Sequence, residues 1–222
     1  MVRQERALRT REALIEAAAT VFDRDGFNVA SLTAISSLAG VSNGALHFHF
    51  ASKAGVAGAV EEAASRRLDH IVTAHEGAVG NALQLLVNTS HDLARRLGED
   101  VVLRAGFDLS REQAHRSDRD LYRQWHEWVE GALKRADGEG VLNEVTPEQV
   151  TSSVVAATTG FEVLGARDPQ WLSRRTVTRF WQLLLPRLAT PAVLDDLEAA
   201  GGPAPSAPAG GRRGNTGPSG TG

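Results

Sequence analysis

Apolar residues recur along most of the chain at every third or fourth position, which is the spacing of one face of an α-helix. In residues 10–25, for example, Ile15, Ala18 and Phe22 share a face, and Gly26 then ends the pattern. Residues 1–9 are polar and are expected to form an arm, and no stretch predicts a strand. The pattern therefore predicts an all-α protein, with helices over residues 10–25, 52–73, 81–97, 100–109, 118–137, 147–164 and 169–188 besides the segment described next.

Local signals mark several of these helix boundaries. Gly98 is expected to end one helix, Gly106 to interrupt the following one, and Asp118 to cap the helix after that. The run Thr146-Pro147-Glu148-Gln149 combines a threonine cap, a proline in the first turn and a glutamine that can close a capping box.

Residues 31–53, SLTAISSLAGVSNGALHFHFASK, have the pattern of two short helices joined by a tight turn. Ser31 and Ser42 can cap the two helices, because a serine oxygen accepts from an unpaired amide of the first turn. Gly40 permits the left-handed backbone of the corner between them. This is the helix-turn-helix pattern, although an ordinary helical hairpin in an all-α protein shares it.

The second helix of this pair divides into a packing face and a polar face. At about 100° per residue, Asn43 and His47 lie close together on one side, with Gly44 beside them. Asparagine can contact adenine through two hydrogen bonds, histidine can donate to a phosphate or a base, and glycine lets the helix approach the DNA backbone. Lys53, directly after the Ser52 cap of the next helix, is placed to meet a phosphate.

Residues 10–60 resemble the DNA-binding domain of the tetracycline-repressor (TetR) family. The resemblance rests on TREALIEAAATVFDRDGF (residues 10–27) and SLTAISSLAGVSNGALHFHFASKAGV (residues 31–56), whose spacing follows the family pattern without a gap. The ending GALHFHFASK is most similar to the γ-butyrolactone autoregulator receptors of filamentous actinobacteria. Asn43 stands where that subgroup usually has lysine, and His47 where it usually has tyrosine. The candidate DNA-contacting residues are Ser31, Thr33, Ser42, Asn43, Gly44, His47 and Lys53.

The composition adds little to the case for DNA binding. The 222 residues carry a formal net charge of −3, although the first eleven hold four arginines and one glutamate. The chain has no cysteine, which excludes disulfides and fits a reducing, cytoplasmic location. It shows neither an apolar leader nor an apolar run of about 18 residues, so neither secretion nor a membrane span is expected.

The resemblance implies an N-terminal DNA-binding domain followed by a helical domain for ligand binding and dimerisation. Gly77 and Gly80 mark the expected boundary, which gives domains over residues 1–74 and 75–200. The segment 201–222 contains 8 Gly, 4 Pro and 2 Ser and is expected to be a disordered tail. Residues 147–164 and 169–188 carry apolar stripes, and they are expected to pair with their copies in a homodimer.

The receptor subgroup carries a tryptophan where LYRQW places Trp125, which implies that this side chain walls a pocket for a small apolar effector. A tryptophan on a helical stripe with Leu121 and Trp128 is equally an ordinary core residue. Thr158 and Thr159 lie in an apolar helix, where a hydroxyl bonds either to its own helix or to a ligand. The candidate ligand-binding residues are Trp125, Thr159, Thr158, Phe161, Phe107 and Leu86.

No catalytic or metal-binding constellation stands out, because the seven histidines are scattered and no zinc or phosphate motif occurs. We therefore expect no enzyme and no cofactor, but a homodimeric repressor of double-stranded operator DNA, without a membrane role. A γ-butyrolactone-type effector would release it, and the expected targets are secondary-metabolite and antibiotic genes. Two alternatives remain: a receptor-like repressor that senses an antibiotic or a biosynthetic intermediate, and a helical enzyme or ligand carrier without a DNA role.

Overall fold

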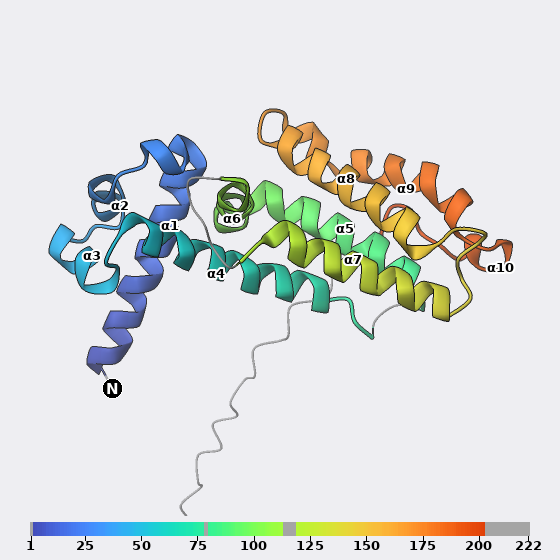
Figure 1. Ribbon diagram of the computed structural model, residues 1–222, viewed down its shortest axis with the longest axis horizontal. Coiled ribbons are helices and arrows are strands. Elements are labelled where there is room, and N and C mark those ends of the chain that lie inside the picture. The colour runs from blue at the N-terminus through green and yellow to red at the C-terminus, as the bar shows by residue number, and fades with distance from the viewer. Residues whose placement is uncertain (1, 78–79, 113–118, 203–222) are drawn as a thin grey trace, which may run out of the picture.

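The computed structural model describes residues 2–77, 80–112 and 119–202, and this part of the chain is helical nearly throughout (Figure 1). Its one β pairing is an isolated bridge between Leu142 and Ala189. The elements in order are α1 (Val2–Val29), α2 (Leu32–Leu38), α3 (Asn43–His49), α4 (Lys53–Thr73), α5 (Ala82–Glu99), α6 (Val101–Arg111), α7 (Leu121–Gly138), α8 (Pro147–Gly165), the 3₁₀ helix η1 (Pro169–Leu172), α9 (Arg174–Leu188) and α10 (Pro191–Leu194). The all-α prediction is confirmed.

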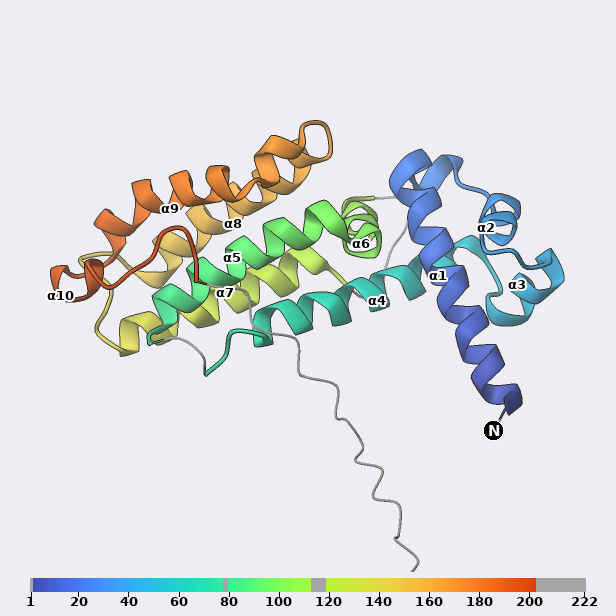
Figure 2. The ribbon, with the colours of Figure 1, turned by 180° about the vertical axis from the view of Figure 1, so that it is seen from behind.

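The helices form two parts that share α4 (Figures 1 and 2). Helices α1–α3 gather at one end of the molecule. From there α4 runs into the second part, where α5 and α7 lie beside it and α8 and α9 form an outer layer. Helix α6 is short, is seen nearly end-on in Figure 1, and packs against both α1 and α4. The fold thus places a small helical unit at the end of a longer bundle.

Several predicted boundaries are confirmed. Ser31, Ser42 and Ser52 accept hydrogen bonds from first-turn amides of α2, α3 and α4. Thr146 and Gln149 form the predicted capping box at the start of α8. These caps satisfy amides that have no partner within their own helix.

Other boundary predictions are wrong. The expected polar arm is the first part of α1, whose sequence VRQERALRTRE is rich in good helix formers. Gly98 lies inside α5, and Gly106 lies inside α6 without interrupting it. The helix expected from residue 169 is split into η1 and α9, with Ser173 capping the second.

Two further predictions concern segments that the structure describes only in part. Asp118 lies outside the described residues, and it is Asp120 that caps α7. The tail was expected from residue 201, but Gly201 is buried and Gly202 is hydrogen-bonded to Asn88. The rest of the predicted tail, residues 203–222, lies outside the described residues.

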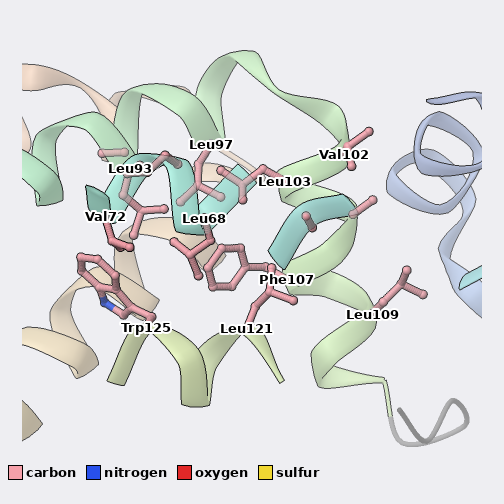
Figure 3. Close-up of a cluster of buried hydrophobic side chains, with 14 of the residues drawn as sticks. Leu68, Val72, Leu93, Leu97, Val102, Leu103, Phe107, Leu109, Leu121 and Trp125 are labelled. Carbon is pink, nitrogen blue, oxygen red and sulfur yellow. The ribbon is translucent and has the colours of Figure 1, made fainter. Parts of the chain in front are cut away.

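The buried apolar side chains form one cluster that runs from α1 to α9. Figure 3 shows its central part, where α4, α5, α6 and α7 contribute side chains to the same interior. The labelled residues are Leu68, Val72, Leu93, Leu97, Val102, Leu103, Phe107, Leu109, Leu121 and Trp125. Because this core crosses the expected boundary at residue 74, α4 belongs to both parts.

The most extensive packing between helices in the described residues joins α4 to α6. Gly106 of α6 sits directly on α4, where an added Cβ would overlap the Cβ of Ala64 and lie 3.2 Å from Leu121. The absence of a side chain at this position therefore sets the distance between the two helices.

No helix of the described residues is long and apolar enough to cross a membrane.

Gly106→Ala should lower the free energy of unfolding. An added methyl forces α6 away from α4 at a cost of about 1–3 kcal/mol, which the better helix propensity of alanine offsets by only roughly 0.5–1 kcal/mol. Urea unfolding followed by circular dichroism measures the difference. The matched control is Gly131→Ala on α7, where an added Cβ meets nothing within 4 Å, so that variant should gain stability. Equal gains in both variants would contradict the close crossing.

Candidate nucleic-acid interface and effector site

Helices α2 and α3 form the predicted helix-turn-helix. Ser31 Oγ accepts from the Ala34 amide at 3.1 Å, and Ser42 Oγ accepts from the Ala45 amide at 3.1 Å. Gly40 lies between them with a φ of 67°, a conformation that glycine adopts without strain. Ile35 and Leu46 are fully buried and fix the packed faces of the two helices. The opposite face of α3 is consequently turned outward.

That outward face carries Asn43, Gly44 and His47, as predicted, and also Phe48, which the sequence analysis missed. Phe48 is 82% exposed, an unusual position for a phenylalanine in a folded chain. A side chain at Gly44 would meet only Ser42 Oγ at 3.8 Å, so packing within the chain does not require glycine there. The missing side chain instead leaves room for an external partner close to the helix.

Asn43 is tied to α2 by two hydrogen bonds. Its Oδ1 accepts from Ser36 Oγ at 2.7 Å, and its Nδ2 donates to Thr33 Oγ1 at 3.4 Å. The structure thereby brings two of the predicted DNA-contacting residues, Thr33 and Asn43, together on the exposed surface. These bonds orient the amide at the start of α3.

Lys53 has a structural role that differs from the predicted phosphate contact. Its Nζ donates to the carbonyls of Phe27, Asn28 and Ala30 at 2.7, 3.1 and 3.0 Å, and lies 4.7 Å above the Phe27 ring. An ammonium has three N–H groups, so these carbonyls occupy all of them. Lys53 therefore holds the end of α1 against the start of α4, and a phosphate contact would have to displace these bonds.

Arg11 is a cation near α3 that the sequence analysis did not single out. Its guanidinium lies 5.4 Å above the ring of Phe50, the residue that caps the C-terminal end of α3. The four arginines among the first eleven residues were the available signal, but Arg11 lies in the helix predicted over residues 10–25, and nothing in that pattern placed it beside Phe50.

In the second part, Trp125 lies in the core. It is 2% exposed, stacks on Trp128 at 5.2 Å between ring centroids, and donates from Nε1 to Thr158 Oγ1 at 2.8 Å. The structure thus joins two predicted ligand-binding residues, Trp125 and Thr158. The role of Trp125 as the wall of a pocket stays a prediction.

Trp128 supplies a polar atom that the sequence analysis did not consider. Its indole Nε1 is buried and has no hydrogen-bond partner among the described residues. A buried donor without a partner costs about 1–3 kcal/mol, so such positions call for an explanation. The stacked pair therefore offers an apolar double ring with one unused donor.

The other predicted ligand-binding residues are distributed around this pair rather than gathered at it. Leu86 and Phe107 are buried core residues. Thr159 is half-buried, and Phe161 packs edge-on against Phe180 of α9 at 5.7 Å. Of the two threonines, Thr158 is the one bonded to the indole.

Comparison with known proteins agrees with this geometry. The sequence pattern of "Bacterial regulatory proteins, tetR family" matches residues 14–60. The A-factor receptor protein of Streptomyces griseus is 30% identical over 207 residues, which cover 90% of this chain and 71% of that protein. The chain belongs to the TetR family.

Solved structures extend the similarity to the whole described fold. A γ-butyrolactone receptor described as an ArpA-like protein superposes with a TM-score of 0.75 at 28% identity, covering 88% of this chain and 96% of that one. CprB of Streptomyces coelicolor, solved in complex with its operator sequence, gives a TM-score of 0.73 at 28% identity, covering 86% and 94%. Members of the TetR family are transcriptional regulators and not enzymes, and this chain is a helix-turn-helix regulator of that kind.

This TetR-family chain also contains a buried polar cluster that sequence reasoning missed. Glu162 of α8 is 6% exposed; it accepts from Tyr122 Oη at 2.7 Å and from Arg111 Nη1 at 3.3 Å. Burial raises the pKa of Glu162 above its ordinary value, against the lowering effects of these two donors. The cluster ties α6, α7 and α8 together at one point.

A second ion pair connects α6 to the DNA-reading part. Arg104 donates to both carboxylate oxygens of Asp23 on α1, at 3.0 and 3.2 Å, and to the carbonyl of Leu97 at 3.0 Å. No sequence signal pairs residues 81 positions apart, so only the fold reveals this contact.

Among the described residues, no group of three His, Cys, Asp or Glu could hold a metal ion.

Proposed function

We propose that this chain is a dimeric repressor that leaves its operator DNA when a small apolar effector binds the second part. The observation that carries the proposal is the exposed face of α3 with Asn43, Gly44, His47 and Phe48, in a chain 30% identical to the A-factor receptor. In a helix-turn-helix, the N-terminal residues of the second helix reach base edges in the major groove. Because operator DNA lies in the cytoplasm of bacteria, the repressor acts there.

Each proposed DNA contact follows from its place on this surface. Asn43 exchanges its bonds to α2 for an adenine edge, and His47 donates to a base or a phosphate. Phe48 lies against sugars or a thymine methyl group. Ser31, Thr33 and Ser42 flank these residues at the starts of α2 and α3 and reach the phosphates. Lys53 acts indirectly, by holding α1 and α4 together.

The proposed dimer forms through α8, η1 and α9. Four large apolar side chains are exposed on these elements: Val163, Leu164, Trp171 and Leu183, of which Leu183 is 79% exposed. Exposed apolar residues gathered on two neighbouring helices are typical of an interface. Two copies present two reading helices, as a two-fold operator requires.

The proposed effector binds at the Trp125–Trp128 pair. The two indoles offer an apolar surface, and the unused N–H of Trp128 offers a hydrogen bond to a carbonyl. Thr158 Oγ1 accepts from Trp125 and donates to the Val154 carbonyl of its own helix at 2.9 Å, so it holds Trp125 in place. An acyl-substituted γ-butyrolactone has both an apolar chain and a carbonyl. The name of the receptor structure that superposes on this chain supports the same class.

The close packing of Trp125 weighs against a lactone at this position. A tryptophan that is 2% exposed and already bonded to Thr158 leaves little room for a lactone beside it. The second candidate is a receptor-like repressor that senses an antibiotic or a biosynthetic intermediate instead. Titration of both ligand classes in one DNA-release assay distinguishes the two.

The operator test compares two substitutions on the outward face of α3. Asn43→Ala should relax sequence preference, and His47→Ala should weaken binding, each by roughly 1–3 kcal/mol, because each removes a group placed for a base or phosphate. Mobility shift with DNA from the neighbourhood of the gene measures both. The control is His126→Ala, an exposed histidine on α7, which should bind like wild type. Wild-type binding by both α3 variants would contradict the proposal.

The dimer test is Leu183→Glu. The Leu183 side chain is exposed in the isolated chain, so the substitution should change the stability of the monomer by less than about 0.5 kcal/mol. In the proposed dimer it would place an unpaired charge in the interface. Sedimentation should show a monomer, and the affinity for the operator should fall because a monomer presents only one reading helix. Phe180, which packs on Phe161 and Trp181, is less suitable, because a charge there also disturbs the core. The control Leu8→Glu, also exposed but on α1, should remain dimeric.

The effector test is Trp128→Phe. The substitution keeps an aromatic ring but removes a buried N–H without a partner among the described residues. The free energy of unfolding should therefore be unchanged or slightly higher. Release of DNA by an acyl-γ-butyrolactone should need about tenfold more ligand, the equivalent of one lost hydrogen bond. The control Trp181→Phe removes another buried indole N–H without a partner among the described residues, on α9, and should respond normally. A Trp128→Phe variant that responds like wild type removes this indole from the effector site.

A further inference from the structure

A cavity of about 210 Å³ lies between α5, α9 and the last described residues of the chain. Its lining includes His75, Asn88, His91 and Arg174 but none of the residues of the Trp125–Trp128 pair. Figure 2 shows the last described segment running back from α10, below α9, to the side of α5. We call this segment, residues 198–202, the strap.

The strap is held by a dense set of hydrogen bonds. Gln84 donates to the Glu198 carbonyl and accepts from its amide, at 3.2 and 2.8 Å. Arg174 donates to the carbonyls of Ala200 and Gly201 at 3.0 and 3.1 Å, and the Gly202 amide donates to Asn88 at 2.9 Å. His91 Nε2 lies 2.9 Å from the Ala199 carbonyl. The strap is therefore held in a fixed position over the cavity.

The backbone of the strap is adapted to this position. Gly201 has a φ of 71°, and a Cβ there would lie 2.9 Å from the His91 ring. Only glycine combines this backbone conformation with such a close approach to the imidazole. The glycines that predicted disorder are, at this point, a requirement of packing.

His75 lines the cavity and is 4% exposed, yet its Nε2 has no hydrogen-bond partner among the described residues. The nearest carboxylate oxygen, Asp92 Oδ2, is 3.9 Å away, beyond hydrogen-bond distance. Asp92 itself is engaged by Arg95 through its other oxygen. Burial lowers the pKa of His75, against the raising effect of the Asp92 charge, so the neutral ring is favoured and its Nε2 is left without a partner.

The charges around the cavity favour an anion. Arg174 pairs with no carboxylate of the described residues. Burial lowers the pKa of His91, and the positive charge of Arg174 adds to this effect. Arg95, which also lines the cavity, pairs with Asp92 and with Glu99. Two guanidinium groups, those of Arg95 and Arg174, thus line the cavity with one carboxylate, that of Asp92. The remaining wall is apolar and consists of Ala94, Leu172 and Val177.

We propose that this cavity is a second ligand site, separate from the effector site, for a small carboxylate with a short apolar chain. The carboxylate accepts from His75 Nε2–H and lies in the positive field of Arg174. The chain of the ligand packs against Leu172, Val177 and Ala94. Binding stabilises the strap, because the ligand fills the space that the strap covers.

Hexanoate is the probe, and calorimetric titration of the full-length protein is the measurement. Hexanoate should bind, and hexanol at the same concentration should bind at least tenfold more weakly, since it lacks the charge. His75→Phe should weaken hexanoate binding at least tenfold. Ala94→Leu, which fills the cavity and keeps every polar group, should do the same. Hydrogen exchange at the amides of the strap should slow with hexanoate in the wild type.

The control His126→Phe makes the same change at an exposed histidine of α7 and should bind hexanoate like wild type. The proposal is overturned if hexanoate does not bind, if hexanol binds equally, or if both cavity variants keep wild-type affinity. Loss of hexanoate binding in Trp128→Phe would assign the ligand to the effector site and overturn it as well. The experiment contains no DNA, so its failure leaves the proposed repressor function untouched.

Discussion

The close crossing of α4 and α6 at Gly106 is the contact on which the arrangement of the two parts depends. With no side chain at Gly106, α6 rests on Ala64, and the same short helix packs against α1. Helix α4 begins directly after α3, and its first residue, Lys53, holds the end of α1. A displacement of α6 is therefore passed to α1 and α4 together, since closely packed helices cannot absorb it by deformation.

Polar contacts connect this crossing to the ligand-binding part. Arg111 of α6 reaches Glu162 of α8, which also accepts from Tyr122, one turn before Trp125 on α7. Arg104, on the same α6, is paired with Asp23 of α1. An effector that separates α7 from α8 thus acts on the Arg111 end of α6, and Arg104 connects the same helix to α1. It changes DNA affinity only to the extent that it binds one arrangement better than the other.

The sequence predicted what is local and periodic: the helical class, the serine caps, the Thr146 capping box and the outward face of α3. It missed what depends on distant partners. Lys53 has the sequence position of a phosphate contact, but three carbonyls contributed by residues 27–30 bind its ammonium. Gly106 was expected to interrupt a helix, and a neighbouring helix instead makes it necessary. Gly201 looked like part of a disordered tail because its partner, His91, is 110 positions away in the sequence.

The role of Lys53 also bears on how this protein binds DNA. Helix α3, NGALHFH, contains no lysine or arginine, and the lysine that follows it is bound to carbonyl groups. The salt dependence of binding reflects the number of cations placed on phosphates. The nearest such cations come from α1, where Arg11 is held against Phe50. In the proposed complex, the hydrogen bonds of Asn43 and His47 and the apolar contact of Phe48 therefore supply a larger share of the affinity. Those of these contacts that reach base edges depend on base identity, so low charge at the reading helix would favour selectivity for the operator over other DNA.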